Sequence, residues 1–211
     1  MSEKNPPERL VFFTDAVVAI ALTLLVLPLT DIVPDLVATH ARSIQVFTDH
    51  QWQIRSFLVI GRQWLSHHRL FGQVTAFSTH LFFVNMAWLL TVVVMPFSTQ
   101  MVGGFGADKF ACLFYIGTMV ANSLCLTWLV SLVRRDPQLT GGRSAVSARW
   151  WVDSVGTTVS LMAAFVIAAL VPSINYFAIL LVLVPSIVIK AARLDRVVAT
   201  PDDLDSRAVR G

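Results

Sequence analysis

The chain has 211 residues, of which 55% are hydrophobic and 14% are charged, and its formal net charge is +3 at pH 7. The charged fraction lies well below the quarter that is usual in soluble domains, which excludes an ordinary soluble protein and indicates a membrane protein. This length suits a single bundle of about six membrane spans and leaves no room for a separate soluble domain. Because the basic residues lie between the apolar stretches, no nucleic-acid partner is expected.

The first apolar stretch, residues 9–29, follows a short polar leader at residues 1–8. About 20 apolar residues at 1.5 Å per residue cover roughly 30 Å, which is enough to cross a bilayer. The stretch is too long for the apolar core of a signal peptide, and no small-residue cleavage site follows it. It contains one internal charge, Asp15, and a carboxylate inside a membrane needs a partner and marks a candidate functional site.

The helical positions of the side chains in this stretch separate its polar residues from one another. At about 100° per residue, Ile20, Thr23 and Leu27 lie within about 60° of each other and form one stripe. Asp15 lies about 80° to 140° away from that stripe. We therefore predict that, if the stripe faces a central axis, Asp15 faces neighbouring helices and holds the first helix in place.

The apolar pattern predicts an all-α membrane protein with six transmembrane helices in residues 9–193. The second helix is the weakest prediction, because Arg55, Arg62 and Arg69 are spaced by seven and share one face, which we expect to meet protein, water or the interface. The predicted spans are about 9–30, 47–68, 79–101, 108–133, 150–171 and 174–193, followed by a cytoplasmic tail at 194–211.

The basic residues predict the orientation of these spans. With both termini in the cytoplasm, only Arg42 and Lys109 fall in outside loops. The inside loops and termini then hold a much larger set: Lys4, Arg9, Arg69, Arg134, Arg135, Arg143, Arg149, Lys190, Arg193, Arg196, Arg207 and Arg210.

Three groups of residues in the first half of the chain resemble the motifs of one channel family. The first group resembles the pattern RxxxFSDxxxAIxxTLL of the transmembrane protein 175 family of potassium channels, a lysosomal channel and its prokaryotic relatives. Thr14 stands where that family has serine and keeps the hydroxyl group. The matching residues are Arg9, Phe13, Thr14, Asp15, Ala19, Ile20, Thr23, Leu24 and Leu25, then Ser56, Phe57, Trp64, His67, His68 and Phe71, and finally Asn85, Pro96 and Phe97.

The resemblance implies a potassium-selective channel without a chemical step or an organic cofactor, not an enzyme. It implies a homotetramer in a prokaryotic cell (inner) membrane, with the first helix lining a central pore for monovalent cations. No TVGYG carbonyl filter is present, so side chains must form the constriction. Ile20, Thr23 and Leu27 are the candidate rings, and Leu24 is the alternative for the second ring, because it lies only about 40° beyond Ile20.

We also predict a buried polar network that joins three helices. Asp15 and Thr14 are expected to meet Trp64, Asn85 and one of the two adjacent histidines, because a buried carboxylate needs donors. Arg62 is the alternative counter-ion of Asp15. Asp31, at the outer end of the first helix, either concentrates cations at the pore mouth or is an ordinary solvated acid.

Three other interpretations compete with the channel. Asp15 with His67 and His68 could serve a secondary transporter or a membrane enzyme, although neither paired repeats nor a catalytic motif is evident. Adjacent histidines point about 100° apart and do not readily share a metal, so no metal site is expected. The third competing interpretation is a structural membrane subunit. Cys112 and Cys125 are expected to be core residues.

Overall fold

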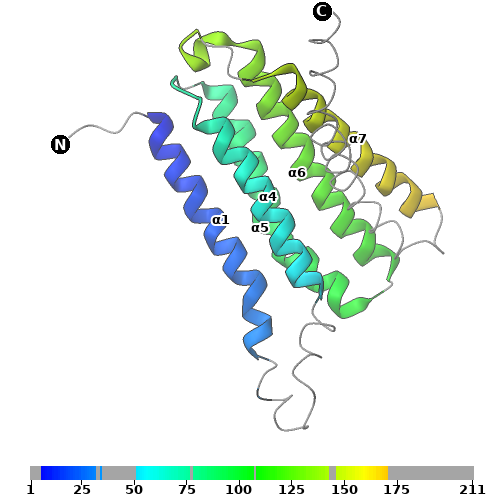
Figure 1. The fold of residues 1–211 in the computed structure, drawn as a ribbon. Coiled ribbons are helices and arrows are strands. Elements are labelled where there is room, and N and C mark those ends of the chain that lie inside the picture. Colours follow the sequence, from blue (N-terminus) through cyan, green and yellow to red (C-terminus); the bar gives the residue numbers. More distant parts are fainter. Residues whose placement is uncertain are drawn as a thin grey trace, which may run out of the picture.

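The computed structural model describes residues 6–31, 34, 51–76, 78–106, 108–142 and 146–170. Throughout these residues the regular structure is helical (Figure 1). The elements are α1 (Pro6–Asp31), α4 (Gln51–Phe71), α5 (Thr79–Phe105), α6 (Lys109–Arg135), the 3-10 helix η1 (Pro137–Thr140) and α7 (Ala148–Leu170).

The helices form a bundle in which α5 and α6 pack closely against each other. Helix α1 lies against α4 and α5, and α7 lies against α6 on the other side of the bundle (Figure 1). The beginnings of α1 and α7 lie at the same end of the bundle as the ends of α4 and α6. There the backbone N–H of Thr75 donates to the carbonyl oxygen of Leu139 over 2.8 Å, which ties the loop after α4 to η1.

Four helices in the described ranges are long and apolar enough to cross a membrane: α1, α5, α6 and α7. Helix α4 does not meet this criterion, in keeping with its three arginines. The described part of the chain is therefore all-helical, and its four apolar helices indicate an integral membrane protein. The predicted sixth span at 174–193 lies outside the described residues, as do residues 47–50 of the predicted second span.

The core of the bundle lies between α5 and α6. Trp88 and Val92 on α5 and Ile116 and Leu129 on α6 are fully buried and belong to the hydrophobic core. Helix α7 joins α6 partly through hydroxyl groups, because Ser123 Oγ lies 2.8 Å from Thr158 Oγ1. Such interhelical hydrogen bonds between small polar residues are typical of membrane helices.

A second polar contact joins α4, α5 and α6. The hydroxyl of Thr99 donates to Ser56 Oγ over 2.9 Å, and Ser56 Oγ lies 3.0 Å from the hydroxyl of Tyr115. All three residues are buried. Each hydroxyl therefore has a partner within the protein, as burial in an apolar bundle requires.

The third helix is longer than the sequence prediction. Its predicted span ended at about residue 101, but α5 continues through Gly103 and Gly104 to Phe105. The burial of Val102 outweighs the low helix propensity of the two glycines. The turn begins instead at Gly106, whose φ of 60° suits glycine. Asp108 then caps α6, its side chain accepting from the N–H of Ala111.

Candidate functional site

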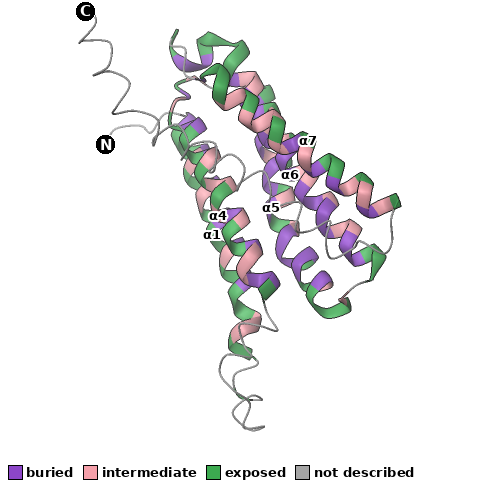
Figure 2. Ribbon diagram, turned by 45° about the vertical axis from the view of Figure 1, so that its right-hand side comes forward, coloured by how far each residue is buried: buried purple, intermediate pink, exposed green. Residues whose placement is uncertain are grey.

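Helix α1 buries one stripe of side chains, and in the described part of the structure its opposite side is exposed. The buried residues recur at helical spacing on the side that faces α4 and α5, and Figure 2 shows them alternating with exposed residues along the helix. They are Leu10, Thr14, Val18, Ala21 and Leu25, with exposed fractions between 0% and 8%.

The uncovered side of α1 carries the residues predicted to form a constriction. Ile20 is 61% exposed, Leu27 is 54% exposed and Leu24 is 44% exposed. Thr23 is also exposed, and its hydroxyl donates to the carbonyl oxygen of Ile20 over 2.7 Å. This bond uses the hydroxyl hydrogen, so the lone pairs of Thr23 Oγ1 remain available to other ligands.

Asp15 joins α1 to α4 through two side chains. Its Oδ1 accepts from the indole Nε1–H of Trp64 over 2.7 Å, and its Oδ2 lies 3.2 Å from His68 Nδ1. The Asp15 side chain is 25% exposed and that of His68 is 48% exposed. Both carboxylate oxygens therefore have partners, and the ring of His68 lies at the rim of the contact rather than inside it.

Thr14, Asn85 and His67 form the buried part of the same contact. The side-chain amide of Asn85 on α5 donates to Thr14 Oγ1 over 3.0 Å, and its Oδ1 lies 2.6 Å from His67 Nε2 on α4. All three residues are 0% exposed. Because the Asn85 oxygen can only accept, His67 Nε2 carries the hydrogen in this arrangement. Asn85 thus connects α1, α4 and α5.

Two aromatic residues hold His67 in place: Phe71, which was noted only as part of the family motif, and Trp88, which was not predicted. Its ring stacks on Phe71 with centroids 4.3 Å apart and on the fully buried Trp88 with centroids 4.1 Å apart. Phe71 follows His67 by four residues, and Trp88 follows Asn85 by three, so each shares a helix face with a network residue. That spacing was the available signal in the sequence.

The remaining predicted residues lie outside this contact. Arg9 and Phe13 are exposed on α1, and Asp31 is exposed at its far end. Asp15 pairs with His68, and Arg62 lies on another side of α4, in a groove toward α6 and α7. The partner of Asp15 is therefore His68 and not Arg62, the alternative counter-ion.

The chemistry of the cluster is that of a helix connector. In the described ranges, no group of three or more histidine, cysteine, aspartate or glutamate residues could hold a metal ion. Cys112 is buried and Cys125 is half-buried, and both are free thiols. The hydrogen bonds of Asp15 and Asn85 are all directed to neighbouring helices. They determine which side of α1 remains uncovered.

Comparison with known proteins agrees with the motifs in these helices. Residues 9–96 match the family model described as the endosomal/lysosomal potassium channel TMEM175. A protein of Streptomyces collinus that is named a potassium channel is 31% identical over 180 residues, which cover 79% of this chain and 86% of that protein. The chain belongs to the TMEM175 family. Membership of a channel family also agrees with the expectation that the protein is not an enzyme.

Two further TMEM175 proteins are similar to the chain, one in structure and one in sequence. The crystal structure of a lysosomal potassium-selective channel TMEM175 homolog from Chamaesiphon minutus covers 86% of this chain, with a TM-score of 0.56 and 22% identity, and shows the shared fold. The human protein named endosomal/lysosomal proton channel TMEM175 is 24% identical over 136 residues, which cover 63% of this chain and 27% of that protein.

The three-helix contact predicts a stability effect. Replacing Asn85 by alanine leaves Thr14 Oγ1 and His67 Nε2 without their partner inside the bundle, which should cost about 2 kcal/mol of the free energy of unfolding. Thermal unfolding of purified protein should show a lower midpoint. The double substitution Thr14→Val and Asn85→Ala should lower the free energy of unfolding no more than Asn85→Ala alone. Full additivity of the two substitutions would contradict a shared network.

Proposed function

We propose that the chain is the subunit of a potassium channel in which α1 lines the pore. The observation that carries the proposal is the uncovered stripe of α1, which is apolar except for Thr23. A stripe facing only lipid has no need for the three-helix contact that determines its direction. A stripe lining a pore does, since ring residues must point at the axis within a narrow range of angles.

The assembly that follows is a homotetramer with α1 innermost. A single copy of α1 cannot enclose an axial pore, and identical subunits ordinarily close around a rotation axis. Copies of the stripe would then stack Ile20 and Leu27 as rings, with Thr23 between them. Leu24, which is less exposed than Ile20, remains the alternative to Leu27 for the second ring.

Selectivity in this proposal comes from side chains. Apolar rings limit ion entry because a narrow dry constriction disfavours water, and hydroxyl oxygens replace part of the hydration shell of an ion. The lone pairs of Thr23 Oγ1 are free for that role because its hydrogen is donated to Ile20. Without a carbonyl filter, we expect moderate discrimination of potassium over sodium and no bound organic cofactor.

Charge supports an orientation with both termini in the cytoplasm of a prokaryotic cell. Arg9, Arg69, Arg134, Arg135 and Arg149 lie near the helix ends that meet at one end of the bundle. At the opposite end, fewer basic residues lie near the helix ends, namely Arg55 and Lys109, together with Asp31. The positive-inside rule places the arginine-rich end in the cytoplasm. Exposed Asp31 from several copies would then concentrate cations at the outer mouth.

Reversal potentials test the proposal directly. Purified protein in a planar bilayer, with potassium on one side and sodium on the other, should give currents that reverse at a voltage favouring potassium. The current should rise linearly with voltage. It should not saturate as the ion gradient is increased, because passive flow has no transport cycle to saturate. A reversal potential that follows an imposed pH gradient would contradict potassium permeation. Saturable flux coupled to protons would instead favour the transporter alternative.

A polar substitution in the stripe should hydrate the constriction of the pore. Ile20→Asn replaces an apolar ring by amides that bind water, so single-channel conductance should rise severalfold. The measurement is single-channel recording of purified protein in symmetric potassium.

Val26→Asn is the matched control for Ile20→Asn. Val26 is 43% exposed on the same helix but lies about 120° from Ile20. The single-channel conductance of Val26→Asn should stay at the wild-type level. Equal conductance in wild type and Ile20→Asn, or an equal rise in both variants, would refute the assignment of the stripe.

Asp15 should matter for assembly before it matters for ion selectivity. Asp15→Ala removes the acceptor of Trp64 and His68 and frees α1 to rotate, which should cost about 2 kcal/mol and weaken the tetramer. Size-exclusion chromatography with light scattering should show a larger fraction of smaller species, whereas Asp31→Ala should assemble normally. A fully tetrameric Asp15→Ala with altered selectivity would contradict the anchoring role.

A further inference from the structure

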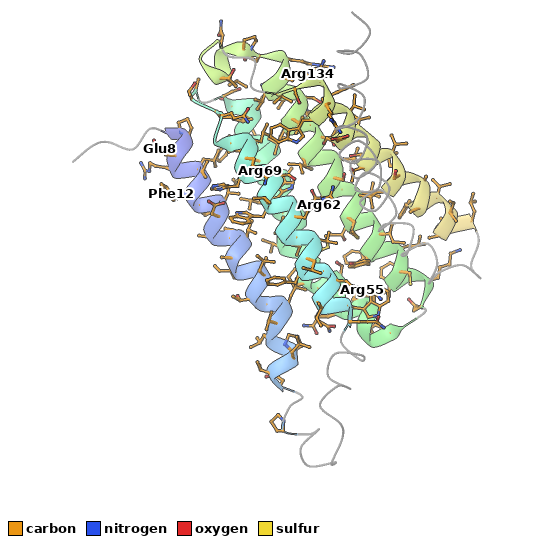
Figure 3. All side chains as sticks on the ribbon, in the orientation of Figure 1. Glu8, Phe12, Arg55, Arg62, Arg69 and Arg134 are labelled. Atoms are coloured by element: carbon orange, nitrogen blue, oxygen red, sulfur yellow. The ribbon has the colours of Figure 1, made fainter. Side chains whose placement is uncertain are left out.

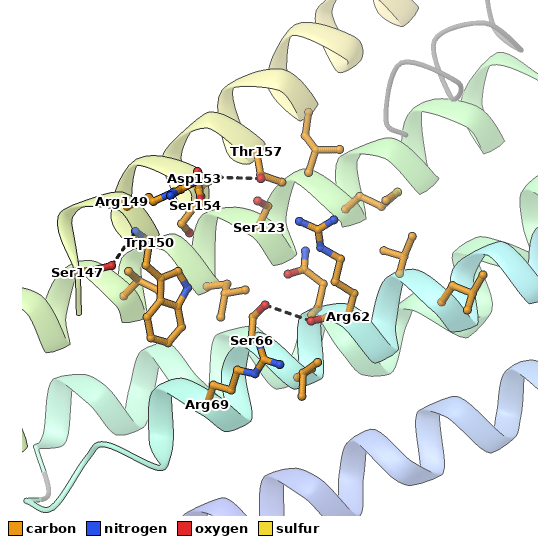
Figure 4. A pocket seen from close by; sticks show the side chains of 18 of the residues that line it. Arg62, Ser66, Arg69, Ser123, Ser147, Arg149, Trp150, Asp153, Ser154 and Thr157 are labelled. Atoms are coloured by element: carbon orange, nitrogen blue, oxygen red, sulfur yellow. Dashed lines mark hydrogen bonds between the residues drawn. The ribbon is translucent and has the colours of Figure 1, made fainter. Parts of the chain in front are cut away.

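A groove of about 830 Å³ separates α4 from α6 and α7, on the side of α4 away from α1 (Figure 4). Its walls come from all three helices. Figure 4 shows the indole of Trp150 pointing from α7 toward α4, and the side chain of Arg62 extending from α4 toward α6 and α7. The groove plays no part in the pore proposed above.

Four arginines line this groove. Arg55, Arg62 and Arg69 follow one another along α4 (Figure 3), and Arg149 comes from α7. Within the described ranges, the only contact closer than 4.0 Å between a basic and an acidic side chain joins His68 to Asp15. Among the described residues that line the groove, Asp153 is the single acidic one, and it makes no such contact. The groove therefore holds an excess of positive charge that the described part of the chain does not neutralise.

Such an excess is costly at the depth where these residues lie. Arg62 stands near the middle of α4, which packs against helices long enough to cross a membrane. A charge at mid-depth in a bilayer costs several kcal/mol unless water or an anion reaches it. Ser123 and Thr157 across the groove offer only hydroxyl groups. An anionic occupant of the groove would compensate this charge.

The rest of the lining indicates what kind of anion fits. Apolar side chains alternate with the arginines, including Leu65 on α4 and Leu126 and Val130 on α6. Arg69 on α4 and Arg149 and Trp150 on α7 all lie near the helix ends at the arginine-rich end of the bundle. Arginine binds phosphate through paired N–H donors, and tryptophan favours the headgroup level of a bilayer. The groove thus combines an anion-binding end with an apolar length.

We propose that this groove is a binding site for an anionic membrane phospholipid. The phosphate group binds at the Arg69 and Arg149 end beside Trp150, and an acyl chain lies along Leu65 and Leu126. Arg62 contacts water or the ester region of the lipid. The bound lipid fills the space between α4 and α7 and neutralises the arginines of both helices.

The predicted helix at 174–193 is a poorer occupant on grounds of charge. That segment contains no acidic residue and carries Lys190 and Arg193. Placing it in the groove would leave the four arginines unneutralised and add two cations. A phospholipid with a net negative charge supplies the apolar length without that conflict.

The site is tested by titrating full-length protein in detergent with phosphatidylglycerol or phosphatidylcholine and counting bound lipid by native mass spectrometry. Phosphatidylglycerol should bind in preference to phosphatidylcholine. Arg69→Gln and Arg149→Gln should each raise the apparent Kd for phosphatidylglycerol about tenfold, the loss of one charge-assisted hydrogen bond. Arg149→Lys should retain most of the binding, which separates charge loss from misfolding.

Arg135→Gln is the matched control, because Arg135 is exposed at the same end of the bundle but outside the groove. Its affinity should equal that of the wild type. Equal binding of the two lipids, or an equal loss in Arg135→Gln, would overturn the proposal. Competition by inorganic phosphate at similar concentration would indicate a soluble anion instead. In a variant lacking Cys112 and Cys125, a disulfide between Leu65→Cys and Leu183→Cys would show that the chain itself fills the groove.

Discussion

The rotation of α1 about its own axis depends on one hydrogen-bonded side chain, Asn85. An apolar helix packed against apolar neighbours can turn with little cost, because dispersion contacts are similar over a range of angles. Hydrogen bonds have a direction, and a polar group buried without its partner is costly. Asn85 reaches Thr14 on one side and His67 on the other, and the rings of Phe71 and Trp88 hold that histidine in place. The contact thereby selects one orientation of α1.

That orientation has a consequence along the whole helix. Thr14 and Leu25 lie on the same buried stripe, so the anchor near one end determines that Ile20 and Leu27 point away from α4 and α5. Asp15 adds a contact on a different side of α1, through Trp64 and His68. Two contacts on different sides resist rotation better than one. A helix whose exposed residues must meet those of symmetry-related copies needs this resistance, since an error of one residue turns the stripe by about 100°.

Sequence reasoning reached some of these features because they depend on local spacing. The length and apolarity of residues 9–29 predict a membrane helix, and the positions of Ile20 and Asp15 on different sides follow from helix geometry alone. Which histidine meets which partner did not follow. His67 and His68 point about 100° apart, and their partners depend on how α4 crosses α1 and α5, which local sequence does not encode. The helical course of Gly103 and Gly104 likewise depends on tertiary burial, which overrides propensity.

Helix α4 explains why hydropathy alone gives a poor account of this bundle. It is too polar to be recognised as a membrane span, yet it packs against both α1 and α5, with Ile60 and Leu70 buried. Its polar residues are divided by direction. Trp64 and His67 face the anchor of α1 and α5, whereas Arg62 and Arg69 line the groove toward α6 and α7. Each polar group thus faces protein or a polar space rather than lipid tails, which is the condition under which a membrane bundle tolerates them. A helix with that division can carry charge at mid-depth while its other side holds α1 in one orientation.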